Sequence, residues 1–264
     1  LDRELLFRKT DGTMFWGSVN AWALRRDDGS LCGLEGLITD IDQRKRSEAT
    51  LRATLEQKDT LLREVHHRVK NNLQILVSLL GLEADRPASA EQLAVLREFA
   101  SRVRAMAQIH ELVYHSKDLN RVDMLEYTRL TADSLYQSCR SCFGMVDCSI
   151  EGSSLPLGLD QAIPCGLLVS EILSNSFRHA FKGNGLRKGS IRVKFETGPD
   201  GKAALILSDD GLCLPPDVGP STGGRLGMTL IPVLAEQLGA ELVLDRSAGT
   251  SYTIRFAIAA VKEP

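Results

Sequence analysis

The sequence lacks the excess of basic residues that marks a protein binding nucleic acid or an anionic membrane. Its 264 residues contain 32 Lys and Arg against 34 Asp and Glu, which gives a formal net charge of −2. Proteins that bind nucleic acids or anionic lipid normally show a clear positive excess. We therefore expect neither a nucleic-acid partner nor direct membrane contact for this chain.

Long apolar runs are missing as well. A membrane-spanning helix needs roughly 18 or more consecutive apolar residues, and no segment approaches that length. No basic stretch followed by an apolar one indicates a leader. We therefore expect a cytoplasmic protein. Because the chain begins at Leu1 and not at Met, we also expect a piece of a longer protein, and an upstream membrane anchor stays open.

The six cysteines do not form a recognisable metal-binding framework. Cys139 and Cys142 make a CxxC with Cys148 nearby, but a zinc site needs a fourth ligand at a suitable spacing and none follows. Cys165 lies in an apolar run and Cys32 in a strand-like one, as reduced packing residues do. We therefore expect cytosolic cysteines that pack and do not bind metal.

Residues 1–42 have the pattern of antiparallel strands. Strand-like runs separated by Asp-Gly turn signals lie at 5–9, 14–25 and 34–41. Three strands of this kind need a partner layer, and this segment is too short to supply one. We therefore expect the end of a larger sheet domain.

From residue 43 the apolar positions follow a helical period. They lie at Leu51, Leu55, Leu62, Val65, Val69, Leu73, Leu76 and Leu80, and Lys58 stands where one more would be expected. With position 58 included, the spacings alternate between four and three, with one extra step of four after Val69. This pattern predicts a heptad seam with a stutter. Pro87 predicts a turn, and a second helix is expected from about 91 to 115. Because two antiparallel helices cannot bury both apolar faces alone, we expect a second copy to complete a four-helix bundle.

After residue 118 the predicted helices and strands mix without regular alternation. Helices are expected at 124–138, 159–181 and 228–238, and strands at 146–151, 190–196, 203–208, 241–245 and 252–257. Such a mixture predicts an α+β sandwich with its helices on one face of the sheet.

A first candidate site is the helical stretch EVHHRVKNNLQ at residues 64–74. At about 100° per residue, His67 points away from the seam on a stripe with Glu64 and Asn71, whereas His66 lies at the edge of the seam. A neutral, exposed imidazole is a good nucleophile toward phosphorus near neutral pH. The alternative is a charged helix face that is merely solvated.

This stretch resembles the phosphoacceptor box of the HWE-like sensor histidine kinases, in the sister group that carries HHRVKNN. The resemblance implies that His67 accepts a phosphoryl group. If a general base assists, Glu64 is the nearest carboxylate on the stripe, and Asn71 completes the candidate catalytic set.

A second candidate cluster lies in the helix expected at 159–181. Glu171, Asn175 and His179 recur four residues apart on one face, with Arg178 beside them. An amide oxygen can bind Mg²⁺ and cations can neutralise phosphates, although an ordinary polar helix face looks the same. The cluster resembles the N-box of the histidine-kinase ATPase superfamily. That implies Asn175 as Mg²⁺ ligand, an ordering or water-mediated role for Glu171, and phosphate contacts for Arg178 and His179.

A third candidate is the Asp-Asp-Gly that follows the strand expected at 203–208. The tripeptide could be a simple turn, but it resembles the superfamily's DxGxG box. There Asp209 would accept an adenine amino hydrogen, and Gly211 would allow close backbone approach. Cys213 stands where the family has its second glycine.

Two further glycine segments resemble the remaining boxes. Residues 223–228 precede a helix whose N-terminal amides would favour phosphate, with Gly227 and Met228 as the candidate contacts. Gly249-Thr250 resembles the last box, with Thr250 as its candidate residue. Each of these segments alone would also fit an ordinary flexible connection.

The order of five boxes over roughly residues 43–258 makes the resemblance specific. It implies an α+β chain in three parts: the end of a PAS sensor domain at 1–42, a helical hairpin for dimerisation and histidine phosphotransfer at 43–117, and a Bergerat-type α/β-sandwich ATP-binding domain at 118–264. The implied reaction is Mg²⁺-dependent transfer from ATP to His67, followed by transfer to an aspartate of a response-regulator receiver domain in the bacterial cytoplasm.

Two alternatives stay open: an ATP-driven machine of the same superfold, and a degenerate kinase that acts only as a scaffold, for which Cys213 is the best argument.

Ile38 stands where flavin-binding PAS domains of the LOV type carry a glutamine. We therefore do not expect a flavin photoreceptor in this segment.

Overall fold

The structure is a computed structural model, and it divides into two compact units, Leu1–Leu62 and Arg63–Pro264. The residues that it describes are 2–85, 89–116, 121–139, 146–181, 188–198, 201–213 and 226–259. Within them no helix combines the length and the apolar character needed to cross a membrane.

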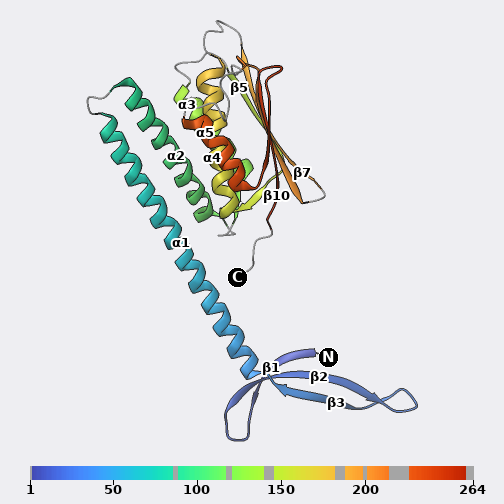
Figure 1. Ribbon diagram of the computed structural model, residues 1–264. Helices are drawn as coiled ribbons and strands as arrows, with labels where there is room; N and C mark the ends of the chain where they lie inside the picture. The colour runs from blue at the N-terminus through green and yellow to red at the C-terminus, as the bar shows by residue number, and fades with distance from the viewer. Residues whose placement is uncertain are drawn as a thin grey trace. The chain divides into compact units, whose positions relative to one another are not determined.

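The first unit contains a meander of three antiparallel strands, β1 (Asp2–Arg8), β2 (Met14–Arg25) and β3 (Leu31–Asp40), with β2 in the centre (Figure 1). The predicted strands are confirmed. Trp22, Leu34 and Leu37 are exposed on this sheet, as is Cys32, which we had expected to be packed. A three-stranded sheet alone cannot bury both of its faces.

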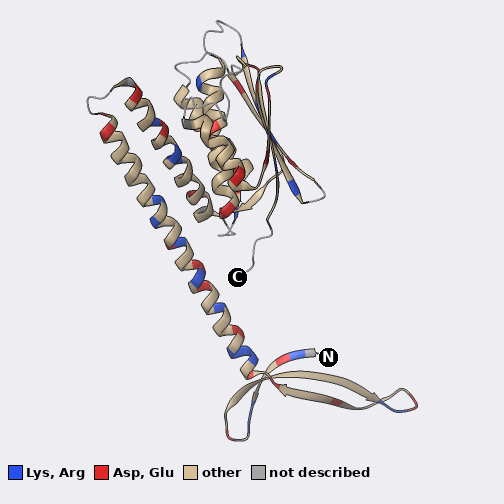
Figure 2. Cartoon of the chain, viewed as in Figure 1, with Lys and Arg blue, Asp and Glu red and all other residues tan. Residues whose placement is uncertain are grey.

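The start of the first helix is tied to this small sheet. The backbone N–H of Trp16 donates to Asp42 Oδ1 over 2.8 Å, and Glu4 on β1 forms ion pairs with both Arg44 and Lys45. These contacts fix where helix α1 (Asp42–Ala84) leaves the last strand. Acidic and basic residues are interspersed along this helix (Figure 2), as expected of a solvated helix surface.

The second helix, α2 (Ala90–His115), begins at a capping box. Ser89 Oγ accepts from the Gln92 N–H, and Gln92 Oε1 accepts from the Ser89 N–H, which satisfies two of the free donors at a helix start. The predicted turn at Pro87 lies outside the described residues.

The predicted seam of α1 divides between two surfaces in the second unit. Val69, Leu73 and Leu80 are half-buried, but Val65 and Leu76 are 54% and 48% exposed. The only buried side chain among the described residues of α1 is His66, at 7% exposure, although we had placed it at the edge of the seam. The burial differs from the prediction because only one side of α1 packs against α2. Residues of the predicted seam that lie off this side stay exposed.

The second unit is built on a five-stranded sheet in the order β5-β7-β8-β10-β9. Its strands are β5 (Val146–Gly152), β7 (Gly189–Thr197), β8 (Lys202–Asp209), β9 (Glu241–Asp245) and β10 (Thr250–Ala257). β5 pairs with β7 in parallel, and the other neighbours are antiparallel. A short pair, β4 (Arg121–Asp123) and β6 (Pro156–Gly158), escaped prediction because three residues show no alternation.

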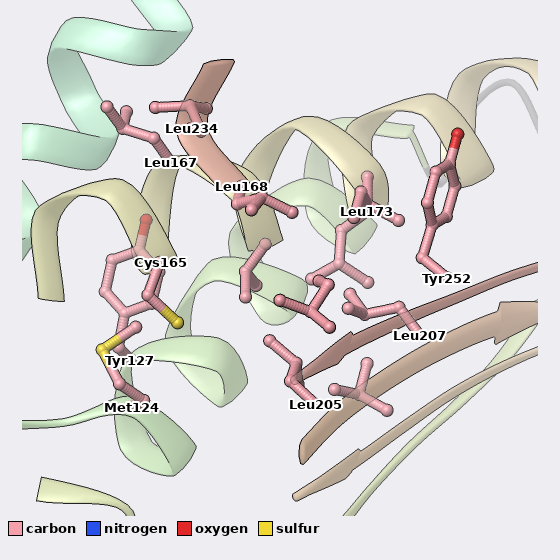
Figure 3. Close-up of a cluster of buried hydrophobic side chains, with 14 of the residues drawn as sticks. Met124, Tyr127, Cys165, Leu167, Leu168, Leu173, Leu205, Leu207, Leu234 and Tyr252 are labelled. Atoms are coloured by element: carbon pink, nitrogen blue, oxygen red, sulfur yellow. The ribbon is translucent and has the colours of Figure 1, made fainter. Parts of the chain in front are cut away.

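Three helices cover one face of this sheet (Figure 1): α3 (Met124–Cys139), α4 (Leu159–Asn175) and α5 (Leu226–Leu238). Leu168 and Leu173 of α4 pack over Leu205 and Leu207 of β8 (Figure 3). The α+β sandwich is thereby confirmed. Cys165 is buried in this core, and burial raises the pKa of its thiol to about 12, as suits a packing residue. Cys142 lies outside the described residues.

Helix α2 is also part of this core. Ala105, Ile109 and Val113 belong to the same buried cluster as α4. Gly166 permits the approach, because a Cβ on it would lie 2.7 Å from Ile109 Cδ1. One side of α2 therefore packs on the sandwich.

The helix predicted at 159–181 changes character before its end. The α-helix stops at Asn175, and residues Ser176–Ala180 form a π-helical turn, η1. π-turns are rare in proteins, but those that occur often lie at functional sites. The Ala180 carbonyl accepts from the Leu212 N–H over 2.6 Å, which ties this turn to the segment after β8.

Candidate active site

His67 is exposed on α1, as its helical position predicts. Its Nδ1 lies 3.4 Å from Asn71 Nδ2, one turn along the same helix. On the other side, the ring centroid of Tyr114 on α2 lies 5.7 Å from that of His67. The imidazole therefore has a polar neighbour at one nitrogen and an aromatic ring beside it, while the side chain stays open to solvent.

Glu64 lies one turn before Arg68 and is engaged by it. Arg68 Nε donates to Glu64 Oε1 over 2.7 Å, and this hydrogen bond is the main reason why the pKa of Glu64 lies below its usual value. A lower pKa makes a carboxylate a weaker base. The Arg68 contact therefore makes Glu64 a weaker candidate for the general base.

His66 forms a contact that the sequence did not reveal. Its Nδ1 lies 3.2 Å from Nδ1 of His110 on α2. Burial lowers the pKa of both imidazoles, and for His110 the charge of His66 lowers it further. Lys70 pairs with Glu111 across the same two helices. The hairpin is thus held by polar contacts directly beside His67.

A polar pocket brings together five residues of the predicted nucleotide site: Glu171, Asn175, Arg178, His179 and Gly227. It lies where α2, α4, η1 and the start of α5 meet, and its other lining residues are Glu98, Ser101, Ser170 and Ser174. Carboxylate, amide and hydroxyl oxygens are ligands that Mg²⁺ accepts, and the Arg178 guanidinium and the His179 imidazole can donate hydrogen bonds to phosphate. The donor set of this pocket therefore suits Mg²⁺ and phosphate oxygens.

Glu171 is held by an arginine that sequence reasoning missed. Arg102 on α2 donates from Nε to Glu171 Oε1 over 2.6 Å and from Nη2 to Glu171 Oε2 over 3.4 Å. Glu171 is therefore paired with the hairpin helix α2.

Asp209 lies at the other end of the candidate site and is 6% exposed. Its Oδ2 accepts from Ser176 Oγ over 2.7 Å, and its Oδ1 accepts from the Gly211 N–H over 3.2 Å. Burial raises the pKa of this carboxyl, while those hydrogen bonds and one from Thr250 oppose the shift. Position 211 requires glycine, because a Cβ there would lie 2.3 Å from the Ala180 carbonyl oxygen.

The two ends of the site meet at the junction of α4 and η1. Asn175 faces the pocket, and the next residue, Ser176, binds Asp209. Met228 joins them to the sheet, because its sulfur lies 3.6 Å from Asn175 Nδ2 and 3.9 Å from the Tyr252 hydroxyl. Thr250 is paired with Asp209 across the strands. Residues 223–225 of the second glycine segment lie outside the described residues.

The chain matches known proteins over most of its length. Residues 64–139 match the HisKA_2 family, described as histidine kinase. The sensor histidine kinase PdtaS of Mycobacterium tuberculosis is 30% identical over 230 residues, 86% of this chain and 44% of that protein. Blue-light-activated histidine kinase 2 of Erythrobacter litoralis is 26% identical, over 93% of this chain and 69% of that protein. The chain thus spans less than half the length of its mycobacterial relatives.

A solved structure shares the fold. The blue-light activated histidine kinase EL346 of Erythrobacter litoralis superimposes with a TM-score of 0.55 at 23% identity, covering 98% of this chain and 76% of that one. These matches confirm the resemblance to histidine kinases of the HWE type, with residues 64–139 of this chain matching the HisKA_2 family model.

Proposed function

We propose that the chain is the kinase part of a two-component sensor histidine kinase, which phosphorylates its own His67 with ATP. The observation that carries the proposal is the exposed imidazole of His67 beside Asn71, inside a segment that matches a histidine-kinase family. ATP use follows from that family. We propose a cytoplasmic location, because ATP and response regulators are found there.

In the proposed reaction, an imidazole nitrogen of His67 attacks the γ-phosphorus of ATP. The new N–P bond replaces the bond from that phosphorus to the bridging oxygen, ADP leaves, and the ring proton passes to solvent or a base. If the Asn71 amide is turned so that its oxygen accepts from Nδ1–H, Nε2 keeps the lone pair for attack. The protein mainly positions the reactants and neutralises charge.

The pocket at the end of α4 is the proposed nucleotide site. Asn175 would hold Mg²⁺, which offsets phosphate charge when bound, with Glu171 ordering that ligand sphere. Arg178, His179 and the start of α5 at Gly227 and Met228 would contact phosphates. Asp209 would accept a hydrogen bond from adenine, supported by Gly211 and Thr250 at the same end of the site.

The described arrangement keeps this pocket away from His67. The pocket is lined by Ser101 of α2, whereas His67 contacts Tyr114 of the same helix. The two positions are more than three turns apart, about 20 Å of helix, and reacting atoms must come within about 3.5 Å. Transfer therefore requires either a movement of the sandwich along the hairpin or a second copy of the chain.

A second copy is favoured by the exposed apolar residues of the hairpin. Val65, Leu76, Leu79, Val95 and Phe99 are each about half exposed, more than a solvated helix surface needs. Histidine kinases generally dimerise, and we propose a homodimer through residues 43–117.

We propose three functional parts: the end of a PAS sensor at 1–42, the phosphotransfer hairpin at 43–117 and the ATP-binding sandwich at 118–264. Phosphohistidine would pass its phosphoryl group to an aspartate of a response-regulator receiver domain. Blue-light activation belongs to the relatives so named. Ile38 of β3 stands where a flavin-binding glutamine would lie, so we do not propose flavin binding by this segment.

Incubation with γ-labelled ATP tests the proposal. We expect an acid-labile, alkali-stable label that disappears in His67→Ala and persists in part in His66→Ala, because His66 packs against His110 and does not face the substrate. Equal and complete loss in both variants, with folding intact, would refute the assignment of His67. ATP hydrolysis without label would instead indicate an ATPase of the same superfold. Neither label nor hydrolysis would indicate a scaffold.

A further inference from the structure

The ion pair between Arg102 and Glu171 lies between the two functional halves of the second unit. Arg102 belongs to the hairpin helix α2 and Glu171 to α4 of the sandwich. Their side chains are only 10% and 13% exposed. Both guanidinium N–H groups in the contact point to the two oxygens of one carboxylate, a geometry that lysine cannot reproduce.

The Glu171 carboxylate is also confined from the opposite side. A Cβ on Gly227, at the start of α5, would lie 2.6 Å from Glu171 Oε2 and 3.7 Å from Arg102 Nη2. Glu98, one turn before Arg102 on α2, lies 3.8 Å from the same Nη2. The Glu171 carboxylate is therefore confined between the Arg102 side chain and the backbone of Gly227.

Helix α2 contributes directly to the wall of the nucleotide pocket. Glu98 and Ser101 line it together with Asn175 and Arg178. Glu171 lies one helical turn before Asn175, on the same face of α4. The orientation of the Glu171 carboxylate at this pocket thus depends on a residue from outside the sandwich.

We propose that Arg102 is a positioning residue: it orients Glu171 for the Mg²⁺-dependent binding of nucleotide, and so couples nucleotide binding to the packing of α2 on α4. The proposal rests on the proposed function of this pocket as a nucleotide site. Loss of Arg102 would leave a nearly buried carboxylate without its cation, and such a group reorients toward other cations or water. Because linkage is reciprocal, bound Mg²⁺-nucleotide would in turn stabilise the packing of α2.

The test compares nucleotide binding by the parent chain, Arg102→Met, Arg102→Lys and Arg104→Met. Arg104 is the matched control, since it is exposed on the same helix and its Nε donates to the Ala100 carbonyl. Calorimetry with the non-hydrolysable analogue AMP-PNP is performed with excess Mg²⁺ and again with EDTA. Loss of a residue that orients a metal ligand typically costs about 10–100-fold in metal affinity. We expect Arg102→Met to weaken binding about tenfold with Mg²⁺ and much less with EDTA, and Arg102→Lys to lie between Arg102→Met and the parent.

A second measurement follows α2 itself. Hydrogen exchange of the amides of 100–107 is compared with and without Mg²⁺–AMP-PNP. We expect the nucleotide to slow exchange there in the parent and in Arg104→Met, and to have a much smaller effect in Arg102→Met. This readout does not depend on phosphoryl transfer.

The possible results separate the inference from the proposed function. Unchanged Mg²⁺-dependent affinity in Arg102→Met, with a parent that binds, would overturn the inference alone. An equal loss with Mg²⁺ and with EDTA would also overturn it, since a purely structural role has no reason to depend on the metal. A parent chain that binds no nucleotide would overturn the proposed function, and the inference with it.

Discussion

Acid should weaken the hairpin through the His66–His110 pair. Both side chains are held against each other between α1 and α2 with Nδ1 atoms 3.2 Å apart. Burial lowers the pKa of each, so the folded state binds fewer protons than the unfolded chain does. The pair's contribution to stability is therefore fully present above the unfolded pKa of about 6.5 and is lost as the pH falls toward the folded values.

The size of the effect has an upper limit. One histidine that stays neutral in the folded state and titrates near 6.5 when unfolded loses at most about 1.4 kcal/mol between about pH 7.5 and about pH 5.5. Two such histidines lose at most about 2.7 kcal/mol. Because protonation of one imidazole is opposed by the other, we expect the pair to lose about 1–2.7 kcal/mol over that range.

Urea denaturation at several pH values, followed by far-UV circular dichroism, measures this loss. Fluorescence would not serve, because both tryptophans lie in the first unit. The double variant His66→Gln/His110→Gln should lose most of the acid dependence. His67→Gln, the same change one residue away on the exposed face, is the matched control and should keep it. If the double variant shows the same slope as the parent, then the pair does not carry the acid sensitivity and our reasoning about its burial is wrong.

Further predictions concern the nucleotide site and the route of transfer. Asp209→Asn should weaken AMP-PNP binding by ~1–3 kcal/mol in calorimetry, because a buried acceptor for adenine is changed; unchanged affinity would mean that the box is misassigned. Gly211→Ala should lower the melting temperature, since its Cβ would lie 2.3 Å from the Ala180 carbonyl oxygen; an unshifted melting curve would contradict the close packing. Cys213→Gly should bind nucleotide at least as well as the parent. A mixture of His67→Ala and Asn175→Ala chains should regain labelling, because the pocket of one chain lies about 20 Å along α2 from its own His67; no label in the mixture would indicate transfer within one chain.

Sequence reasoning succeeded where a local pattern carries the information. The outward position of His67 follows from its angle to the seam on one helix, and the five predicted pocket residues follow from a helix face and the start of the next helix. The strands of the sandwich alternate buried and exposed side chains, as Ile191 and Arg192 on β7 show, so their positions could be read directly. Such features depend on neighbours within a few residues.

It failed where contacts join distant parts of the chain. Arg102 and Glu171 are 69 positions apart, and His66 and His110 are 44 apart. The apolar period of each helix predicts which side is buried, but it does not predict which polar residue on another helix will be contacted. The π-turn at Ser176–Ala180 was read as plain helix, because its residues have ordinary helical preferences and the turn is stabilised through the Leu212 contact to Ala180.

Helix α2 contacts both of the proposed sites. One side of it provides His110, Glu111 and Tyr114 to the surroundings of the phosphoacceptor. Arg102 of the same helix binds Glu171, which lines the proposed nucleotide pocket. A side chain on a helix moves with its neighbours, because the backbone is rigid over a few turns. A rotation of α2 that loosened the contacts around His67 would therefore also displace Arg102 from Glu171. The accessibility of His67 and the binding of nucleotide would then change together, although no single residue that the structure describes contacts both His67 and the nucleotide pocket.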